Sequence, residues 1–127
     1  MAALKPTFGS GSTDGNLISV TATATPGTTL HTAITGTNHI DEVYVYVCNI
    51  HTDEMPITLE IDGVAAANRI IYTVPYNDGM HMVLPGIRMQ NGGTIAAFAG
   101  TPSAAGTTAV LNCMVVVNTL IDPETAS

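Results

Sequence analysis

The sequence predicts an all-β fold: an antiparallel β-sandwich of about eight strands, jelly-roll-like or another Greek key, with an extended N-terminal arm. Short runs rich in Val, Ile, Thr and Tyr recur between turn residues, at the intervals of about 8–12 residues that are typical of sandwiches and barrels. No stretch keeps the apolar period of a helix for more than a turn or two. We place the sandwich domain at residues 16–121.

Residues 1–15 are predicted to be a flexible N-terminal arm, because they have no periodicity and G-S-G-S-T-D-G has the composition of a linker. The candidate anchors in this arm are Leu4, Lys5 and Phe8. The arm is expected either to fray, as many termini do, or to order against a neighbouring molecule. In the second case these three residues would form part of a protein interface.

The strand pattern begins with residues 16–25, which end at the turn pair Pro26-Gly27, and continues with residues 28–34. Residues 40–62 give the clearest pattern in the chain, a strand, a polar turn and a second strand, and are predicted to form a hairpin. The apolar faces of these two strands are expected to be core: Val43, Val45, Val47, Ile57, Leu59 and Ile61. The opposite face of the second strand is expected to lie in water: Thr58, Glu60 and Asp62.

The second half of the chain begins with a connection at residues 63–68 that has room for a helical turn. Strands are then predicted at residues 69–74, 80–84, 87–90, 94–99 and 107–121, followed by a polar tail at residues 122–127. The last strand is the longest, and one of its faces is almost purely apolar and should be core: Leu111, Cys113, Val115, Val117 and Thr119. Its other face carries Met114 and Val116.

Two sets of side chains have alternative interpretations. Tyr44 and Tyr46 lie opposite the valine face of their strand, so they form either a second core face or a surface that packs against a partner. Cys48 and Cys113 lie within apolar strands, so they are either small buried hydrophobic residues or, in a favourable geometry, a disulfide.

Composition and charge exclude several classes of partner. Only 10% of the residues are charged, against roughly 25% in an ordinary domain, which suits a surface partly covered by copies of the chain or by a larger host. The net charge of −7 argues against nucleic acid or an anionic membrane, since both require a basic footprint. No apolar run has the length of a membrane span, and we expect the protein to be made in a cytoplasm.

The sequence contains no motif for catalysis or for a cofactor. There is no G-x-S-x-G, no phosphate-binding loop and no pair of His or Cys residues at metal-ligand spacing, so we expect neither an enzyme nor a metal or cofactor site. The acidic turn with His51, Asp53 and Glu54 is the nearest candidate for a cation site. We interpret these three residues instead as a solvated loop tip or as contacts to another protein.

Several stretches resemble small all-β capsid decoration, or cement, proteins of tailed bacteriophages. The stretches are T-P-G-T-T-L-H-T-A (25–33), D-E-V-Y-V-Y-V-C-N (41–49), I-T-L-E-I-D-G (57–63), I-I-Y-T-V-P (70–75), V-L-P-G-I-R-M-Q-N-G (83–92) and V-V-V-N (115–118). Together they cover most of residues 25–120, and they are patterns of strands and turns rather than catalytic motifs.

The resemblance implies a non-enzymatic virion protein on the outer surface of the assembled capsid. It would bind the major capsid protein, form a homotrimer at local three-fold positions and bridge neighbouring capsomers, with Leu4, Lys5, Phe8, Tyr44 and Tyr46 as interface candidates together with the acidic turn. The alternative is a receptor- or carbohydrate-binding β-module of a phage tail or fibre, which would be expected to carry a concave patch of aromatic and acidic side chains.

Overall fold

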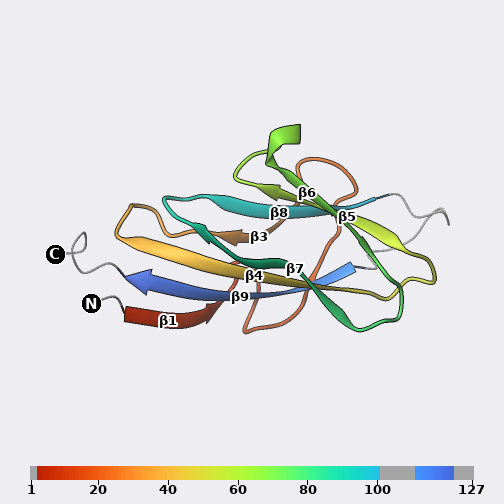
Figure 1. Cartoon of the computed structure of the whole chain (residues 1–127), viewed down its shortest axis with the longest axis horizontal. Helices are drawn as coiled ribbons and strands as arrows, with labels where there is room; N and C mark the ends of the chain where they lie inside the picture. The colour runs from red at the N-terminus through yellow and green to blue at the C-terminus, as the bar shows by residue number, and fades with distance from the viewer. Residues whose placement is uncertain (1–2, 101–110, 122–127) are drawn as a thin grey trace.

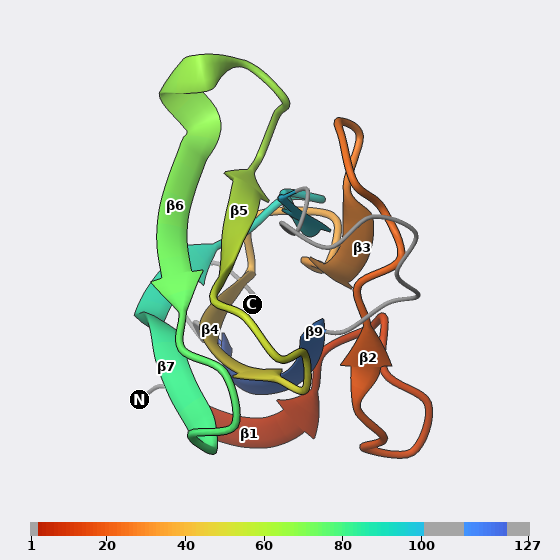
Figure 2. The same cartoon turned by 90° about the vertical axis from the view of Figure 1, so that its right-hand side faces the viewer.

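The computed structural model describes residues 3–100 and 111–121, and the side chains of residues 6–100 and 111–120. The prediction of an antiparallel β-sandwich is confirmed, because two antiparallel sheets pack face to face (Figure 1). Sheet A has the order β1-β9-β4-β7, with β2 also pairing with β9, and sheet B has the order β3-β8-β5-β6. In Figure 2, β6 and β7 lie on one side of the sandwich and β2 and β3 on the other.

The strands of sheet A are β1 (Ala3–Phe8), β2 (Ile18–Ser19), β4 (His39–Asn49), β7 (Met80–Met89) and β9 (Leu111–Ile121). The strands of sheet B are β3 (Thr28–Thr32), β5 (Met55–Ile61), β6 (Arg69–Val74) and β8 (Thr94–Ala99). A 3-10 turn, η1 (Ala66–Asn68), lies in the connection where a helical turn was predicted.

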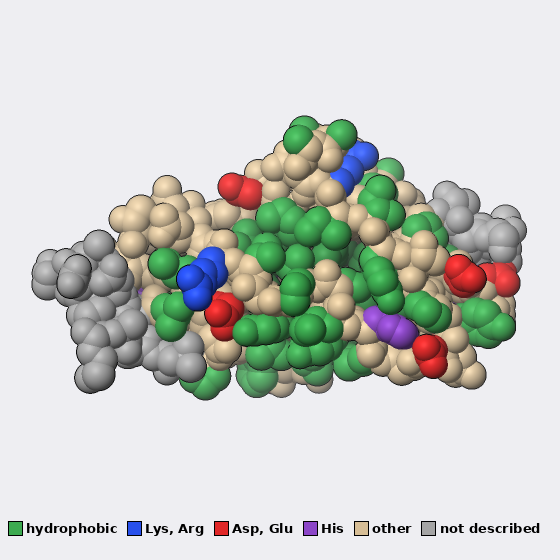
Figure 3. Space-filling model, viewed as in Figure 1, with side chains coloured by type: hydrophobic (Ala, Val, Ile, Leu, Met, Phe, Trp, Pro, Cys, Tyr) green, Lys and Arg blue, Asp and Glu red, His purple; other side chains and the backbone are tan. Residues whose placement is uncertain are grey.

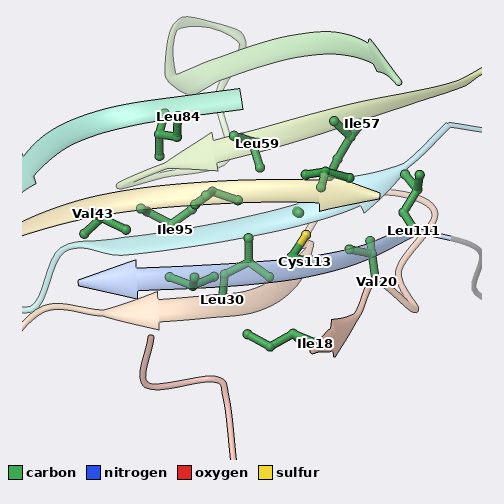
Figure 4. Packing of buried hydrophobic residues seen from close by; sticks show 14 of the residues in the cluster. Ile18, Val20, Leu30, Val43, Ile57, Leu59, Leu84, Ile95, Leu111 and Cys113 are labelled. Carbon is green, nitrogen blue, oxygen red and sulfur yellow. The ribbon is translucent and has the colours of Figure 1, made fainter. Parts of the chain in front are cut away.

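The core lies between the two sheets, where apolar side chains of both layers meet (Figure 4). The predicted core face of β4 is confirmed, since Val43, Val45 and Val47 are completely buried. Ile57 and Leu59 are buried as well, whereas Ile61 is partly buried at the margin of the cluster. The predicted core face of β9 is confirmed from Leu111 to Thr119.

The predicted hairpin at residues 40–62 is wrong, because β4 belongs to sheet A and β5 to sheet B. The apolar faces of the two strands meet across the sandwich, which buries more apolar surface than pairing side by side. Asn49 holds the corner between the sheets. Its Nδ2 donates to the carbonyl oxygens of Asp53 (2.9 Å) and Val74 (3.0 Å), and its Oδ1 accepts from the backbone N–H of His51 (2.8 Å).

Glu60 is buried, which corrects the prediction of a wet face on β5; Thr58 is buried too, and only Asp62 is exposed. The carboxylate of Glu60 accepts hydrogen bonds from the Gly27 N–H (2.7 Å) and from the Thr25 hydroxyl (2.6 Å). A segment far away in the sequence therefore covers this face of sheet B and satisfies the carboxylate.

The segment at residues 16–25 is mostly a loop and not the predicted strand, since β2 contains only two residues. The Thr28 hydroxyl accepts hydrogen bonds from the backbone N–H groups of Thr21 and Ala22, so a side chain replaces the partners that a sheet would supply. The two short strands predicted at residues 80–84 and 87–90 are instead one strand, β7, whose register with β4 shifts twice around Pro85.

The N-terminal segment differs from the predicted flexible arm, because Ala3–Phe8 form strand β1 along the edge of β9. The loop that follows is tied to both sheets, since the Gly9 N–H donates to the Val115 carbonyl and the Gly11 N–H to the Leu30 carbonyl. A segment with linker composition is thus ordered by backbone hydrogen bonds that composition does not reveal.

The two cysteines lie on opposite faces of sheet A and are not joined in a disulfide. Val47 is the register partner of Cys113, so Cys113 faces the core with Val47 while Cys48 faces outward. Burial raises the pKa of the Cys113 thiol to about 12, and the neighbouring Cys48 adds a smaller contribution.

A thiol-labelling experiment checks this arrangement. At neutral pH iodoacetamide should modify only Cys48 in the folded protein, because Cys113 is buried and forms almost no thiolate. Mass spectrometry should find one label per folded chain and two after unfolding in denaturant. The variant Cys48→Ser should remain unlabelled while folded, and rapid labelling of that variant would contradict the burial of Cys113.

Candidate interaction surface

The outer face of sheet A carries apolar side chains on four strands. Antiparallel register partners share a face, so the outward side chains follow from the pairing of β4 with β9 and β7, and of β9 with β1. We call this surface the tyrosine–methionine face, and it consists of Phe8, Tyr44, Tyr46, Cys48, Met80, Met82, Met114 and Val116.

The apolar side chains of this face are exposed to an unusual degree. Phe8 is 55% exposed, Met82 51% and Met80 46%, while both tyrosines are half-buried. A rim of polar groups bounds the face. At one end the Arg88 Nε lies 3.9 Å from the Glu42 Oε2, and at the other the Ser19 hydroxyl donates to the Asn112 Oδ1 (2.9 Å). An apolar centre within a polar rim is typical of a protein interface.

Tyr44 is held in a fixed orientation on this face. Its hydroxyl donates to the Glu42 Oε1 (2.8 Å), and this hydrogen bond to a carboxylate, with a smaller effect of desolvation, raises the pKa of Tyr44 above its ordinary value. Its ring covers Gly86, where an added Cβ would come within 2.9 Å of the ring atoms. The bulge at Pro85-Gly86 therefore positions an aromatic side chain on the surface.

Replacing Gly86 with alanine is expected to lower the free energy of unfolding by about 1–3 kcal/mol, because the φ of +89° is unfavourable for any residue with a Cβ. Gly79→Ala is the matched control, since Gly79 also has a positive φ but has nothing within 4 Å of its Cβ position. Denaturant titration should show a larger loss of unfolding free energy for Gly86→Ala than for Gly79→Ala. Equal losses would show that the Tyr44 ring adds nothing to the backbone strain.

A second feature is a pocket of about 360 Å³ between β1, β3, β4 and β9. The residues around it include Phe8, whose side chain lies on the outer face of sheet A, the exposed Ile34, and the polar residues His31, His39 and Asp41. The base of the pocket is a buried polar cluster. Asp41 accepts from the Thr119 hydroxyl through Oδ1 (2.7 Å) and bonds the Nε2 of His31 through Oδ2 (2.7 Å).

The hydrogen bonds of His31 define its tautomer. Its Nδ1 accepts from the Ser10 backbone N–H (2.9 Å), so Nδ1 carries no proton and Nε2 donates to Asp41. Ser10 uses its hydroxyl oxygen to accept from the Thr32 N–H (2.7 Å). Both imidazole nitrogens are thus engaged, and neither is directed at a hydroxyl that it would activate. The cluster ties the loop after β1 to β3 and β4.

The structure brings together three of the residues predicted from the sequence, Phe8, Tyr44 and Tyr46, all on the tyrosine–methionine face. Leu4 and Lys5 belong to β1, where they pair with Leu120 and Thr119 of β9. The side chains of Leu4 and Lys5 lie outside the described part of the molecule.

The other three, His51, Asp53 and Glu54, lie in the β4–β5 connection, where the Asp53 N–H donates to the Nδ1 of His51. This turn follows β4 at the end of the tyrosine–methionine face where Cys48 lies. The three residues are therefore grouped with one another but are not part of the face itself.

Sequence reasoning missed two features of this region. Met80 and Met82 stand two residues apart in M-H-M, which could have placed both on one strand face. No local signal could have paired His31 with Asp41, because a bulge in β3 and contact between two different sheets bring them together.

In the described residues, no group of three or more His, Cys, Asp or Glu side chains is placed to hold a metal ion. None of the helical segments described is long and apolar enough to cross a membrane. Comparisons with protein-family models, curated proteins and solved structures found no match.

Proposed function

We propose that the chain is a non-enzymatic structural protein of a bacteriophage virion that binds the outer surface of the assembled capsid. The observation that carries the proposal is the tyrosine–methionine face: a broad apolar surface on a rigid sheet, bounded by polar groups. The resemblance to capsid decoration proteins suggests that the partner is a capsid shell. The tyrosine–methionine face is the surface by which this chain would bind that shell.

The proposed mechanism is that of a clamp. Each copy buries its tyrosine–methionine face on the major capsid protein, and a trimer at a local three-fold position holds several shell subunits at once. Binding energy that exists only in the assembled shell opposes its dissociation. Linking three modest contacts in a trimer makes the combined attachment tight. The net charge of −7 avoids competition for the packaged DNA.

A second candidate function, a receptor- or carbohydrate-binding module of a tail or fibre, is favoured by the pocket at His31. This pocket combines an exposed isoleucine, Ile34, with Asp41, two histidines and threonine residues. Such a mixture of apolar and polar groups suits the apolar face and the hydroxyl groups of a sugar. Both oxygens of Asp41 are already engaged with Thr119 and His31, so a sugar would depend on the remaining polar groups.

Co-sedimentation separates the two functions. The purified chain is mixed with empty, expanded heads of the phage whose genome encodes it, and the pellet is measured; in parallel, the chain is applied to an array of glycans. We expect saturable binding to the heads and no retained glycan. A chain that stays in the supernatant with heads present would overturn the proposal, and glycan retention in addition would establish the alternative.

A further inference from the structure

Ionisable side chains are few in this chain, and one of the buried ones is a histidine. Only 10% of the residues are charged, and in Figure 3 the charged side chains appear as small scattered groups among hydrophobic and uncharged ones. Within the described part of the chain, three ionisable residues other than cysteine are buried: His31, Asp41 and Glu60. His31 is the one whose residue type changes charge in the neutral to mildly acidic range.

The loop that follows β1, residues 9–12, is bonded directly to the ring of His31. The Ser10 N–H donates to Nδ1 of the ring at 2.9 Å, and the Ser10 hydroxyl oxygen accepts from the Thr32 N–H at 2.7 Å. Two further N–H groups of the loop donate to backbone carbonyls of β9 and β3. Carbonyl and hydroxyl oxygens do not titrate near neutral pH, so Nδ1 is the acceptor of this loop that a proton can remove.

A proton on Nδ1 is incompatible with the contact to Ser10. The lone pair of Nδ1 already accepts an N–H, and a protonated Nδ1 would direct its own hydrogen at the hydrogen of Ser10. Nε2 has no such conflict, because it donates to the Asp41 Oδ2 at 2.7 Å whether the ring is neutral or protonated. Protonation of His31 therefore breaks the contact to the loop and keeps the contact to β4.

The elements around His31 contribute few other charges. The strands β8 and β9 contain no charged residue. β4 contributes Asp41, whose carboxylate balances the charge of a protonated ring, and His39, which lies at the same pocket. Lys5 of β1 is the register partner of Thr119, and its side chain lies outside the described residues. His39 is thus the second titratable group for which an experiment must control.

We propose that the loop at residues 9–12 is a latch controlled by pH, and that Nδ1 of His31 is the group that releases it. The closed loop requires an Nδ1 without a proton, whereas an open loop leaves Nδ1 free to bind one. The open form therefore binds one more proton, and a form that binds more protons gains population as the pH falls. Mildly acidic solution opens the latch, and neutral or alkaline solution closes it.

The latch acts on one strand of the tyrosine–methionine face. The loop begins directly after Phe8, the last residue of β1 and a member of that face. The segment that continues the loop lies against the Phe8 ring, since an added Cβ at Gly15 would come within 2.9 Å of it. Opening the loop at acidic pH therefore loosens the β1 side of the face. The latch itself does not depend on the proposed function.

Nuclear magnetic resonance of the full chain follows the ring and the loop together, from about pH 8 to about pH 5. The ¹⁵N shifts of His31 should show Nε2 protonated and Nδ1 unprotonated at the alkaline end. Exchange protection of the Ser10 and Thr32 amides, corrected for intrinsic rates, should fall by up to about tenfold per pH unit as Nδ1 takes up its proton. The amide of Val45, in the buried strand β4, should keep its protection.

Two variants assign the effect. His39→Gln is the matched control, because it removes the other histidine of the pocket, and its loop should respond to pH like that of the wild type. His31→Asn places an amide oxygen near the position of Nδ1 and binds no proton, so the protection of Ser10 should lose its pH dependence. A variant that fails to fold leaves the wild-type titration as the test.

Four outcomes would overturn the latch. The first two are an Nδ1 that stays unprotonated down to about pH 5, and an Nδ1 that binds a proton while the Ser10 amide stays protected. The third is a loss of Val45 protection in parallel with that of Ser10, which would mean that the whole fold opens. The fourth is a response that disappears in His39→Gln, which would assign it to His39.

Discussion

Replacing Asp41 with alanine is expected to lower the free energy of unfolding by about 3–5 kcal/mol, one of the two largest effects predicted for this protein. Asp41 is 2% exposed and accepts hydrogen bonds from Thr119 and from the Nε2 of His31. Removing the carboxylate leaves two buried donors without a partner and an empty space beside them. Both donors are buried at the base of the pocket, where water would replace only part of the two lost charge-assisted hydrogen bonds, so most of the desolvation cost remains.

Urea denaturation followed by circular dichroism measures this loss. Asp78→Ala is the control, because the side chain of Asp78 is 68% exposed and its carboxylate only approaches the His81 Nε2 at 3.5 Å. The free energy of unfolding of Asp78→Ala should lie within about 1 kcal/mol of the wild-type value. Asp41→Asn keeps one acceptor oxygen, so its free energy of unfolding should fall between those of Asp41→Ala and Asp78→Ala. A stability of Asp41→Ala equal to that of Asp78→Ala would show that the cluster does not hold β3 and β4 together.

The second large effect concerns the tyrosine–methionine face. Met82→Glu is expected to weaken binding to heads by about 30-fold or more, because the contact would bury a carboxylate without a partner. Met82 is half exposed and is the register partner of Tyr46 near the middle of the face. The substitution should leave the fold intact, since the side chain already lies on the outside of sheet A.

Titration of heads with labelled protein provides the measurement. Ile50→Glu is the matched control, because it adds the same charge at an exposed isoleucine that is not part of the face, and it should bind like the wild type. A circular dichroism spectrum and a melting temperature close to those of the wild type exclude unfolding of Met82→Glu as the cause. Equal affinities of the two variants would mean that another surface contacts the shell.

Strand alternation predicted the core faces but not the assignment of strands to sheets. The alternation of Val43, Val45 and Val47 shows which side chains share a face, and that face is buried. Alternation is identical for two strands that pair in one sheet and for two that face each other across a sandwich. The choice between these two arrangements is made in the connection from β4 to β5. There Asn49 forms hydrogen bonds with backbone groups of that turn and with the carbonyl of Val74.

Buried polar residues were the least predictable part. Glu60 alternates with apolar residues as an exposed residue would, and only the hydrogen bonds from Thr25 and Gly27 explain its burial. His31 and Asp41 likewise form a cluster through tertiary contact alone. The tyrosine–methionine face was partly predictable, because Tyr44 and Tyr46 stood out against the valine face, whereas the contribution of β7 required the register between β4 and β7.

A reconstruction of the phage head, with and without this protein, tests the central claim most directly. The proposed function predicts added density on the outer surface of the shell, into which the sandwich fits with the tyrosine–methionine face turned toward the major capsid protein. Heads with no such density, or density for this chain only at a tail or fibre tip, would contradict it.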